Sequence, residues 1–382
     1  MFYYLSQWLL ESIRGTAWED PLSWLRVFQY ISFRSAGAAV TALAASWLLG
    51  PWMIRWLRSM RYRQEYADER TGEIARQEAA RRKIGVPTMG GLLIVAAIDV
   101  SALLWARWTL FMALTLLPLV TLAGLGFLDD YTKLTRRSFL GASARLKFWA
   151  QVGVAAVLGC YLWWNEETRS LVADLFVPFI KHPVLTGAPL VGVVLTILAV
   201  VGSSNAVNLT DGLDGLAIGC VLIVTGVLLV MTYIAGNVKL AEYLLVPYVP
   251  GAGELTVICA AILGAGLGFL WYNCHPAEVF MGDTGSLALG GVLGIMAVLI
   301  QQPFVLLIAG GVFVMEAVSV MVQVSWFRYT RKRYGTGRRV FLCAPIHHHF
   351  QYKGWAETKV VTRFYILGIF FAVIALATLK VR

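Results

Sequence analysis

The chain has 382 residues, of which 58% are hydrophobic and only 14% are charged, and its formal net charge is +10. Soluble domains are about half apolar and about a quarter charged, so this composition excludes an ordinary soluble protein. The five cysteines show no C-x-x-C spacing, which argues against a disulfide framework or a zinc site.

Apolar runs of about 20 residues recur along the chain, and that length spans the ~30 Å of a bilayer core. They predict an all-α fold, a polytopic membrane helical bundle of about ten transmembrane helices in one integral membrane domain over 1–382. Residues 1–33 read as an amphipathic lead-in at the membrane surface, without a cleavable signal peptide. The predicted spans are 34–57, 86–106, 108–128, 147–165, 189–207, 213–235, 254–272, 285–300, 303–328 and 360–380.

The loops between the spans differ strongly in charge. Most bases lie in 58–85, 129–147 and 329–359, which follow the first, third and ninth spans. Basic loops stay in the cytoplasm, so loops after odd-numbered spans are predicted to be cytoplasmic and both termini periplasmic. This topology accounts for most of the basic charge, and no nucleic-acid partner is needed. Glycine pairs at 264/268 and 290/294 are spaced for close helix packing.

The same topology brings four polar clusters to one cytoplasmic face. The first is Asp129-Asp130, where adjacent carboxylates repel and one becomes a plausible proton acceptor. Lys133 lies three and four residues later, on the same face of the helix. The three residues could therefore also be a simple helix end with a local ion pair.

The second cluster runs from Asn205 to Asp214 and places Asn205, Asn208, Asp211 and Asp214 at three-residue steps. Amides, carboxylates and glycine backbone are the parts needed to hold a sugar, a base and a hydrated cation. A polar turn that caps the next helix is the simpler alternative.

The third cluster runs from Asn273 to Ser286 and ends in a Gly-Asp-Thr-Gly-Ser turn that opens a helix. The backbone N–H groups of such a turn face an anion, and Asp283 could hold Mg²⁺. Phe280 could stack on a base, while His275 before a proline is interpreted as structural.

The fourth cluster is the run His347-His348-His349, whose spacing does not suit a zinc enzyme but suits contact with phosphate. Lys83 and the glycines of 83–91 could reach an anion. Within the bilayer, Glu316 and Gln323 share a helix face, where structural pairing and a site role are both open.

Five motifs in order resemble the phospho-N-acetylmuramoyl-pentapeptide transferases, a family of the polyprenyl-phosphate N-acetylhexosamine-1-phosphate transferase superfamily. They are K-x-G-x-P-T-M-G-G at 83–91, Asp129-Asp130, N-x-x-N-L-T-D-G-L-D-G-L at 205–216, M-G-D-T-G-S at 281–286 and A-P-I-H-H-H at 344–349. The resemblance covers nearly the whole chain from residue 34. The segment before it carries no family signature.

The resemblance implies a reaction at the inner face of the bacterial plasma (inner) membrane. UDP-N-acetylmuramoyl-pentapeptide would give its phospho-sugar to undecaprenyl phosphate, with lipid I and UMP as products and Mg²⁺ as cofactor. It also implies a multi-pass protein in contact with membrane lipid, as a homodimer.

The resemblance implies a role for each residue of this chain that matches a functional position in one of the family's motifs. Asp283 would be the magnesium ligand and, with Asp129, Asp130 and the three histidines, part of the catalytic set. Asp129 would deprotonate the lipid phosphate for direct attack, or a carboxylate would form a covalent phospho-intermediate. The substrate-binding positions implied or suggested are Lys83, Thr88, Lys133, Asn205, Asn208, Asp211, Gly212, Leu213, Asp214, Asn273, Phe280, Gly282 and Gln323.

Two other readings are open from the sequence. A sister enzyme of the superfamily would transfer GlcNAc-1-phosphate from UDP-GlcNAc to the same lipid. A transporter or channel would place polar groups near the midplane, where only Asp99 and Glu316 lie, whereas most acids here lie at one surface.

Overall fold

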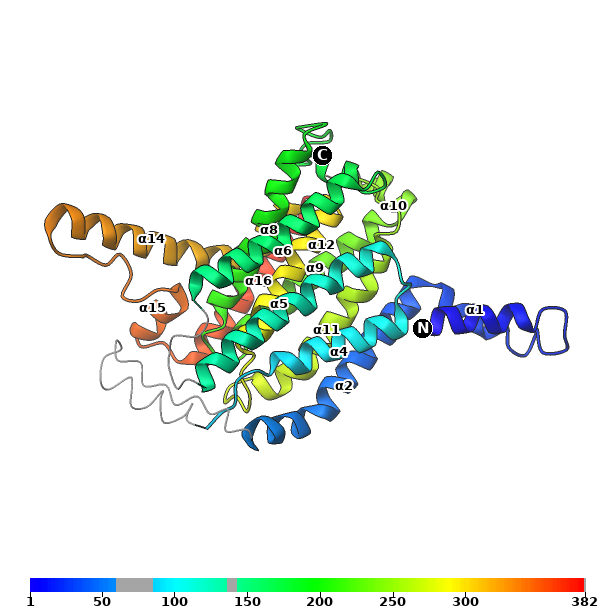
Figure 1. Ribbon diagram of the computed structural model, residues 1–382, viewed down its shortest axis with the longest axis horizontal. Helices are drawn as coiled ribbons and strands as arrows, with labels where there is room; N and C mark the ends of the chain where they lie inside the picture. Colours follow the sequence, from blue (N-terminus) through cyan, green and yellow to red (C-terminus); the bar gives the residue numbers. More distant parts are fainter. Residues whose placement is uncertain (60–84, 136–142, 381–382) are drawn as a thin grey trace.

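A computed structural model describes residues 1–59, 85–135 and 143–380, and that part of the chain is all-helical, as predicted (Figure 1). One isolated antiparallel bridge joins Leu175 and Leu185 between helices. The helices in order are α1 (Phe2–Ser12), η1 (Ser23–Gln29), α2 (Ile31–Ser59), α4 (Gly91–Trp105), α5 (Leu110–Thr135), α6 (Ala144–Trp164), α7 (Arg169–Ala173), α8 (Pro189–Thr210), α9 (Leu216–Ala235), α10 (Val238–Leu244), α11 (Gly253–Asn273), α12 (Gly282–Leu299), α13 (Pro303–Ala309), α14 (Gly311–Tyr334), α15 (Ile346–Tyr352) and α16 (Glu357–Ala377).

Nine helices within the described ranges are long and apolar enough to cross a membrane, so the chain is a multi-pass membrane protein. They are α2, α5, α6, α8, α9, α11, α12, α14 and α16. The apolar α4 is shorter, at 15 residues or roughly 22 Å. The prediction of about ten spans is therefore confirmed as nine long helices and one short one.

Helix α4 is shorter than the predicted span 86–106 because residues before Gly90 leave the helix. Their backbone pairs instead with the segment that leads into α12. The N–H of Phe280 donates to Pro87 O at 2.9 Å, and the N–H of Gly90 donates to Phe280 O at 2.8 Å. This pairing brings the Pro-Thr-Met-Gly-Gly stretch to the start of α12.

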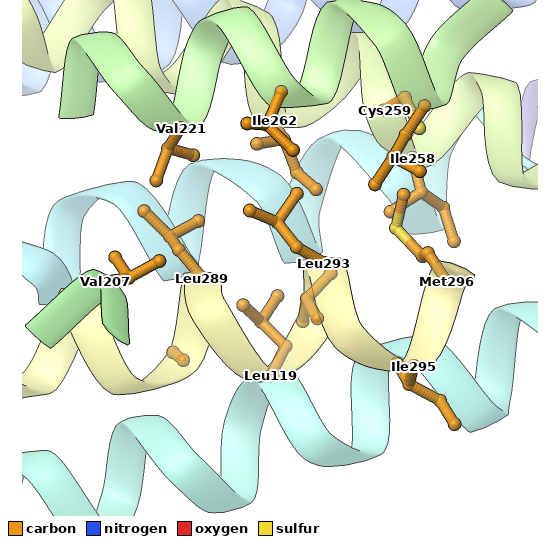
Figure 2. Packing of buried hydrophobic residues seen from close by; sticks show 14 of the residues in the cluster. Leu119, Val207, Val221, Ile258, Cys259, Ile262, Leu289, Leu293, Ile295 and Met296 are labelled. Atoms are coloured by element: carbon orange, nitrogen blue, oxygen red, sulfur yellow. The ribbon is translucent and has the colours of Figure 1, made fainter. Parts of the chain in front are cut away.

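Helix α12 forms the centre of the bundle and is buried almost throughout. It packs on α5, α8, α4 and α9, while α11 packs on α2 and α9. Branched side chains fill the space between these helices, among them Leu119, Val207, Val221, Leu289 and Leu293 (Figure 2).

The glycines of two helices allow close backbone approach, as their spacing predicted. A Cβ on Gly264 would overlap the carbonyl of Ala39, and a Cβ on Gly290 would overlap the backbone of Ser203.

The predicted single span 303–328 is wrong in one respect, because the chain breaks there into α13 and α14. Gly310 leaves the helical conformation, and Gly311 packs so closely on the Phe371 ring that no Cβ would fit. Adjacent glycines favour such a break because they lower helix propensity. Helix α14 then extends away from the bundle, at the left of Figure 1.

Both chain termini lie at the same end of the bundle. The Met1 amino group donates to Leu103 O at 2.8 Å at the far end of α4, and the N–H of Lys380 donates to Leu244 O at 3.1 Å beyond α9. Both α4 and α9 start at the opposite end, where α12 also begins. The predicted lead-in forms α1 and η1, and the Phe2 ring packs on Trp105. A periplasmic location of this end stays a prediction.

Candidate functional site

Three carboxylates meet where α5 ends and α12 begins. Asp129 and Asp130 lie in the last two turns of α5, and Asp283 lies in the first turn of α12. Each offers an oxygen within 4.8 Å of the others. The helices approach closely enough for this because Gly126 of α5 lies directly on the Asp283 backbone, where a Cβ would not fit.

Asp130 accepts hydrogen bonds from the first turn of α12. Its Oδ2 accepts from the N–H and the hydroxyl of Thr284, at 3.1 and 2.8 Å, and its Oδ1 accepts from the N–H of Asp283 at 3.3 Å. A carboxylate in this position satisfies free donors of the helix N-terminus and complements its dipole. Asp130 therefore fixes the position of Asp283.

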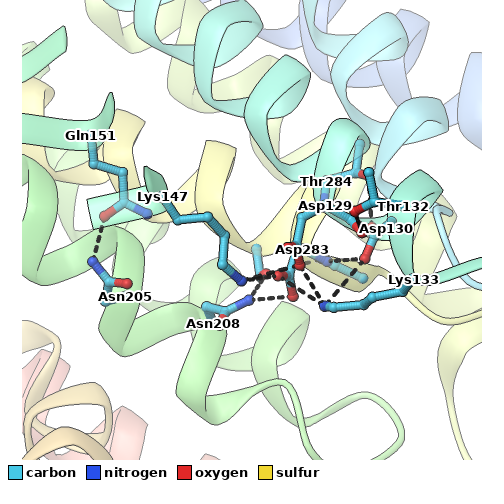
Figure 3. Close-up of polar contacts among 12 residues, drawn as sticks. Asp129, Asp130, Thr132, Lys133, Lys147, Gln151, Asn205, Asn208, Asp283 and Thr284 are labelled. Atoms are coloured by element: carbon cyan, nitrogen blue, oxygen red, sulfur yellow. Dashed lines mark hydrogen bonds and ion pairs between the residues drawn. The ribbon is translucent and has the colours of Figure 1, made fainter. Parts of the chain in front are cut away.

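Two lysines join the other two carboxylates. Lys133 Nζ lies 2.6 Å from Asp129 Oδ2 and 3.2 Å from Asp283 Oδ2. Lys147 Nζ, from the start of α6, lies 3.1 and 3.0 Å from the same two oxygens (Figure 3). The predicted i, i+4 pairing of Lys133 is confirmed. Lys147 was interpreted only as topology-setting charge, although its place at a span entrance facing an acidic pair was a usable signal.

Asn208 completes this cluster from α8. Its Nδ2 donates to Asp283 Oδ1 at 2.8 Å and to Ser286 Oγ at 2.9 Å. Asn205, three residues earlier, points instead to α6, where it donates to Gln151 Oε1, apart from Asp283 in Figure 3. We refer to Asp129, Asp130, Asp283, Lys133, Lys147 and Asn208 as the carboxylate–lysine cluster.

Thr88 and Gly282 lie together beside this cluster. Gly282 has a φ of +72°, and a Cβ there would lie 2.6 Å from Asp130 Oδ2 and 2.7 Å from Thr88 Oγ1. Glycine is required at this position by both the backbone angle and the space. Thr88 is buried beside Gly282, and a role of these two residues in substrate binding stays a prediction.

A second polar group forms around the loop 211–215. Asp214 Oδ2 lies 3.0 Å from His275 Nδ1 and accepts from the N–H of Ala277 at 3.2 Å. Asn273 Oδ1 accepts from the N–H of Gly215 at 3.1 Å, and its Nδ2 donates to Val279 O at 2.8 Å. The loop is thus joined to the segment that carries Phe280.

Glu357 also belongs to this group, since its Oε1 accepts from the N–H of Asp214 at 2.9 Å. No sequence pattern singles out Glu357, because its contact depends on the start of α16 lying over the loop. His275 was interpreted as structural and is bonded to a predicted site residue. Leu213 is buried within the same loop, between Asp211 and Asp214.

The three histidines turn in different directions. His347 is fully buried and meets Glu316 of α14. His348 Nδ1 lies 2.8 Å from Gln351 Oε1, and His349 Nδ1 accepts from the N–H of Leu342 at 3.1 Å. Burial lowers the pKa of His349, and the neighbouring Lys353 ammonium lowers it further. The predicted run therefore supplies one inward-facing imidazole rather than three equivalent ones.

Gln323 and Lys83 are two further residues that were predicted to bind substrate. Gln323 Oε1 accepts from the N–H groups of Val340 and Phe341 at 3.0 and 2.9 Å, so its described bonds hold the loop before α15. Lys83 lies outside the described residues.

The chain was compared with known proteins. A family model described as glycosyl transferase family 4 matches residues 112–301. The phospho-N-acetylmuramoyl-pentapeptide-transferase of Opitutus terrae is 47% identical over 366 residues, covering 95% of this chain and 98% of its own. Those of Methylacidiphilum infernorum and Geobacter sp. strain M21 are 47% and 49% identical, over 94% and 93% of this chain and 96% and 95% of theirs. With a helical membrane bundle, the described parts of five motifs at one end of it and identities of 47–49% over more than nine tenths of the chain, the protein belongs to the phospho-N-acetylmuramoyl-pentapeptide-transferase family.

Proposed function

We propose that the protein transfers phospho-N-acetylmuramoyl-pentapeptide from UDP to undecaprenyl phosphate, giving lipid I and UMP in peptidoglycan synthesis. The reaction takes place at the cytoplasmic face of the bacterial plasma (inner) membrane. The single observation that carries this proposal is the carboxylate–lysine cluster, built by α5, α6, α8 and α12 at one end of an apolar bundle. A water-soluble nucleotide and a lipid phosphate can meet only at such an end.

The charge of the cluster supports a divalent cation. Three carboxylates against two ammonium groups leave one formal negative charge, which repels an incoming diphosphate. Asp129 Oδ1 is buried without a hydrogen bond, while Asp283 Oδ1 accepts from Asn208 and its Oδ2 faces both lysines. Carboxylate oxygens are the ligands that Mg²⁺ prefers, so the residues fit this ion, with Asp283 as its holder. When bound, Mg²⁺ neutralises the diphosphate and stabilises the leaving UMP.

The protein groups around the cluster have separate tasks. Lys133 and Lys147 bind phosphate oxygens, because ammonium groups are the donors at this point. Asp129 accepts the remaining proton of the lipid phosphate. An oxygen of that phosphate then forms a bond to the β-phosphorus of the UDP-sugar, and the bond from that phosphorus to UMP breaks. The loop 211–215, Asn273 and Phe280 hold the uridine, and His347, the inward-facing imidazole, serves the phosphates or the sugar.

The deciding experiment is turnover by the purified protein with undecaprenyl phosphate, Mg²⁺ and one of two donors. We expect UMP release with UDP-N-acetylmuramoyl-pentapeptide and little with UDP-GlcNAc. The reverse preference would identify the sister activity. Absence of UMP from both donors would refute a transferase, and solute uptake into sealed vesicles would then support a transporter.

A second measurement separates direct attack from a covalent intermediate. Protein incubated with the UDP-linked donor alone should release no UMP if the lipid phosphate is the nucleophile. A burst of one UMP per protein molecule would instead require a phosphorylated carboxylate. Light scattering in detergent checks the expected homodimer.

A further inference from the structure

A buried acid–base pair lies outside the carboxylate–lysine cluster. Glu316, in the second turn of α14, and His347, in the first turn of α15, are both fully buried. The distance between Glu316 Oε1 and His347 Nδ1 is 3.1 Å. The pair joins α14, which leaves the bundle, to the histidine segment.

Apart from His347, the described residues around Glu316 provide few groups that could stabilise its carboxylate. Within the described part of the chain neither of its carboxylate oxygens has an aligned hydrogen bond, and the His347 ring is its ion-pair partner. The Cys220 thiol of α9 is near enough to interact electrostatically with Glu316, and the Ser319 hydroxyl donates to Glu316 O rather than to the carboxylate. Burying a carboxylate is costly unless a donor faces it. The Nδ1 of His347 is therefore the atom that has to carry a proton.

The other edge of the His347 ring lies against the loop 211–215. A Cβ on Gly212 would overlap His347 Nε2, so glycine is needed there for the imidazole to reach the loop backbone. The His348 ring lies beside it, with 4.1 Å between ring centroids. The ring is thus held on both sides, with Nδ1 toward Glu316 and Nε2 toward the loop.

We propose that Glu316 is a positioning residue for His347, which keeps Nδ1 protonated and turns Nε2 toward the site for the diphospho-sugar. A carboxylate behind an imidazole fixes the tautomer and orientation of the ring and stabilises its protonated form, as in hydrolytic triads. The proposal rests on the proposed function, since it gives His347 a substrate to face.

The test compares Glu316→Gln with the wild type in the UMP-release assay. Loss of a partner behind a functional imidazole typically lowers activity about 10–100-fold, and we expect that loss in kcat with a smaller change in KM. The double variant should be no slower than His347→Gln alone. Ser319→Ala, one turn further on the same helix, should stay within about twofold of wild type.

Several outcomes would overturn the proposal. One is a Glu316→Gln protein with wild-type kcat, and another is a double variant whose losses multiply. If Glu316→Gln does not purify as a folded protein, ¹⁵N-histidine NMR of the wild type decides, with His347→Gln to assign the signal. A proton on Nδ1 supports the proposal, and a neutral ring protonated on Nε2 alone refutes it. A wild-type protein that releases no UMP counts against the proposed function instead, and the NMR result still tests the pairing.

Discussion

Asp129 and Asp130 are adjacent in sequence, but their contacts predict losses of stability of different size. Asp130 accepts three hydrogen bonds from the first turn of α12, two on Oδ2 and one on Oδ1. In Asp130→Asn an NH₂ group replaces one oxygen and faces a donor. At least one bond to a charged acceptor is lost, worth about 1.5–3 kcal/mol, and the remaining bonds weaken. We expect a loss of about 2–3 kcal/mol in the free energy of unfolding.

Asp129→Asn is the matched control for this prediction. Asp129 contacts only the ammonium groups of Lys133 and Lys147 among its described ion partners, and both lysines keep Asp283. Asp129 itself is fully buried, so the substitution also removes the cost of burying its charge, and no lysine is left without a carboxylate. The expected cost is therefore below about 1 kcal/mol. Denaturant unfolding in detergent gives the two values, and UMP release should fall in both variants. A larger destabilisation in Asp129→Asn than in Asp130→Asn would refute the division of roles.

Three further predictions address other parts of the bundle. Lys147→Met should lower kcat for UMP release roughly 10²–10³-fold, because it removes one of two cations at the reacting phosphates. Gly212→Ala should reduce kcat and lower the free energy of unfolding by about 1–3 kcal/mol, because its methyl group overlaps the buried His347 ring. Glu254→Gln should destabilise the protein by about 3–5 kcal/mol, since it leaves the buried Arg34 guanidinium without its charge partner, while KM measured on the folded fraction stays unchanged.

The sequence predicted the features that depend on local pattern. The length of the apolar runs predicts the membrane spans. The basic loops all follow odd-numbered spans, and this pattern predicts that the motifs lie at the same end of the bundle. Asp129, Asp283 and Lys133 could be chosen because they stand out as polar groups at span edges. The structure brings them into contact as expected.

What could not be predicted depends on contacts between distant segments. The role of Asp130 as a helix cap needs α12 to start beside the end of α5. Glu357 reaches the loop at Asp214 only because α16 begins over it. The α13–α14 break was hidden because hydropathy stays high across Gly310-Gly311, and only packing on Phe371 reveals it.

The arrangement around α12 explains how a charged site is kept in an apolar bundle. Asp283 sits at the N-terminus of the helix that is most completely buried, so its backbone has little freedom to move. The cations that face it come from partly exposed side chains of α5 and α6. The lysine side chains can change partners when a phosphate enters, while Asp283 stays in place. Each ammonium group can turn from a carboxylate oxygen to a phosphate oxygen without movement of a helix. In the proposed mechanism, the carboxylates released in this exchange would then hold the divalent cation, and metal binding would be coupled to substrate binding at one place.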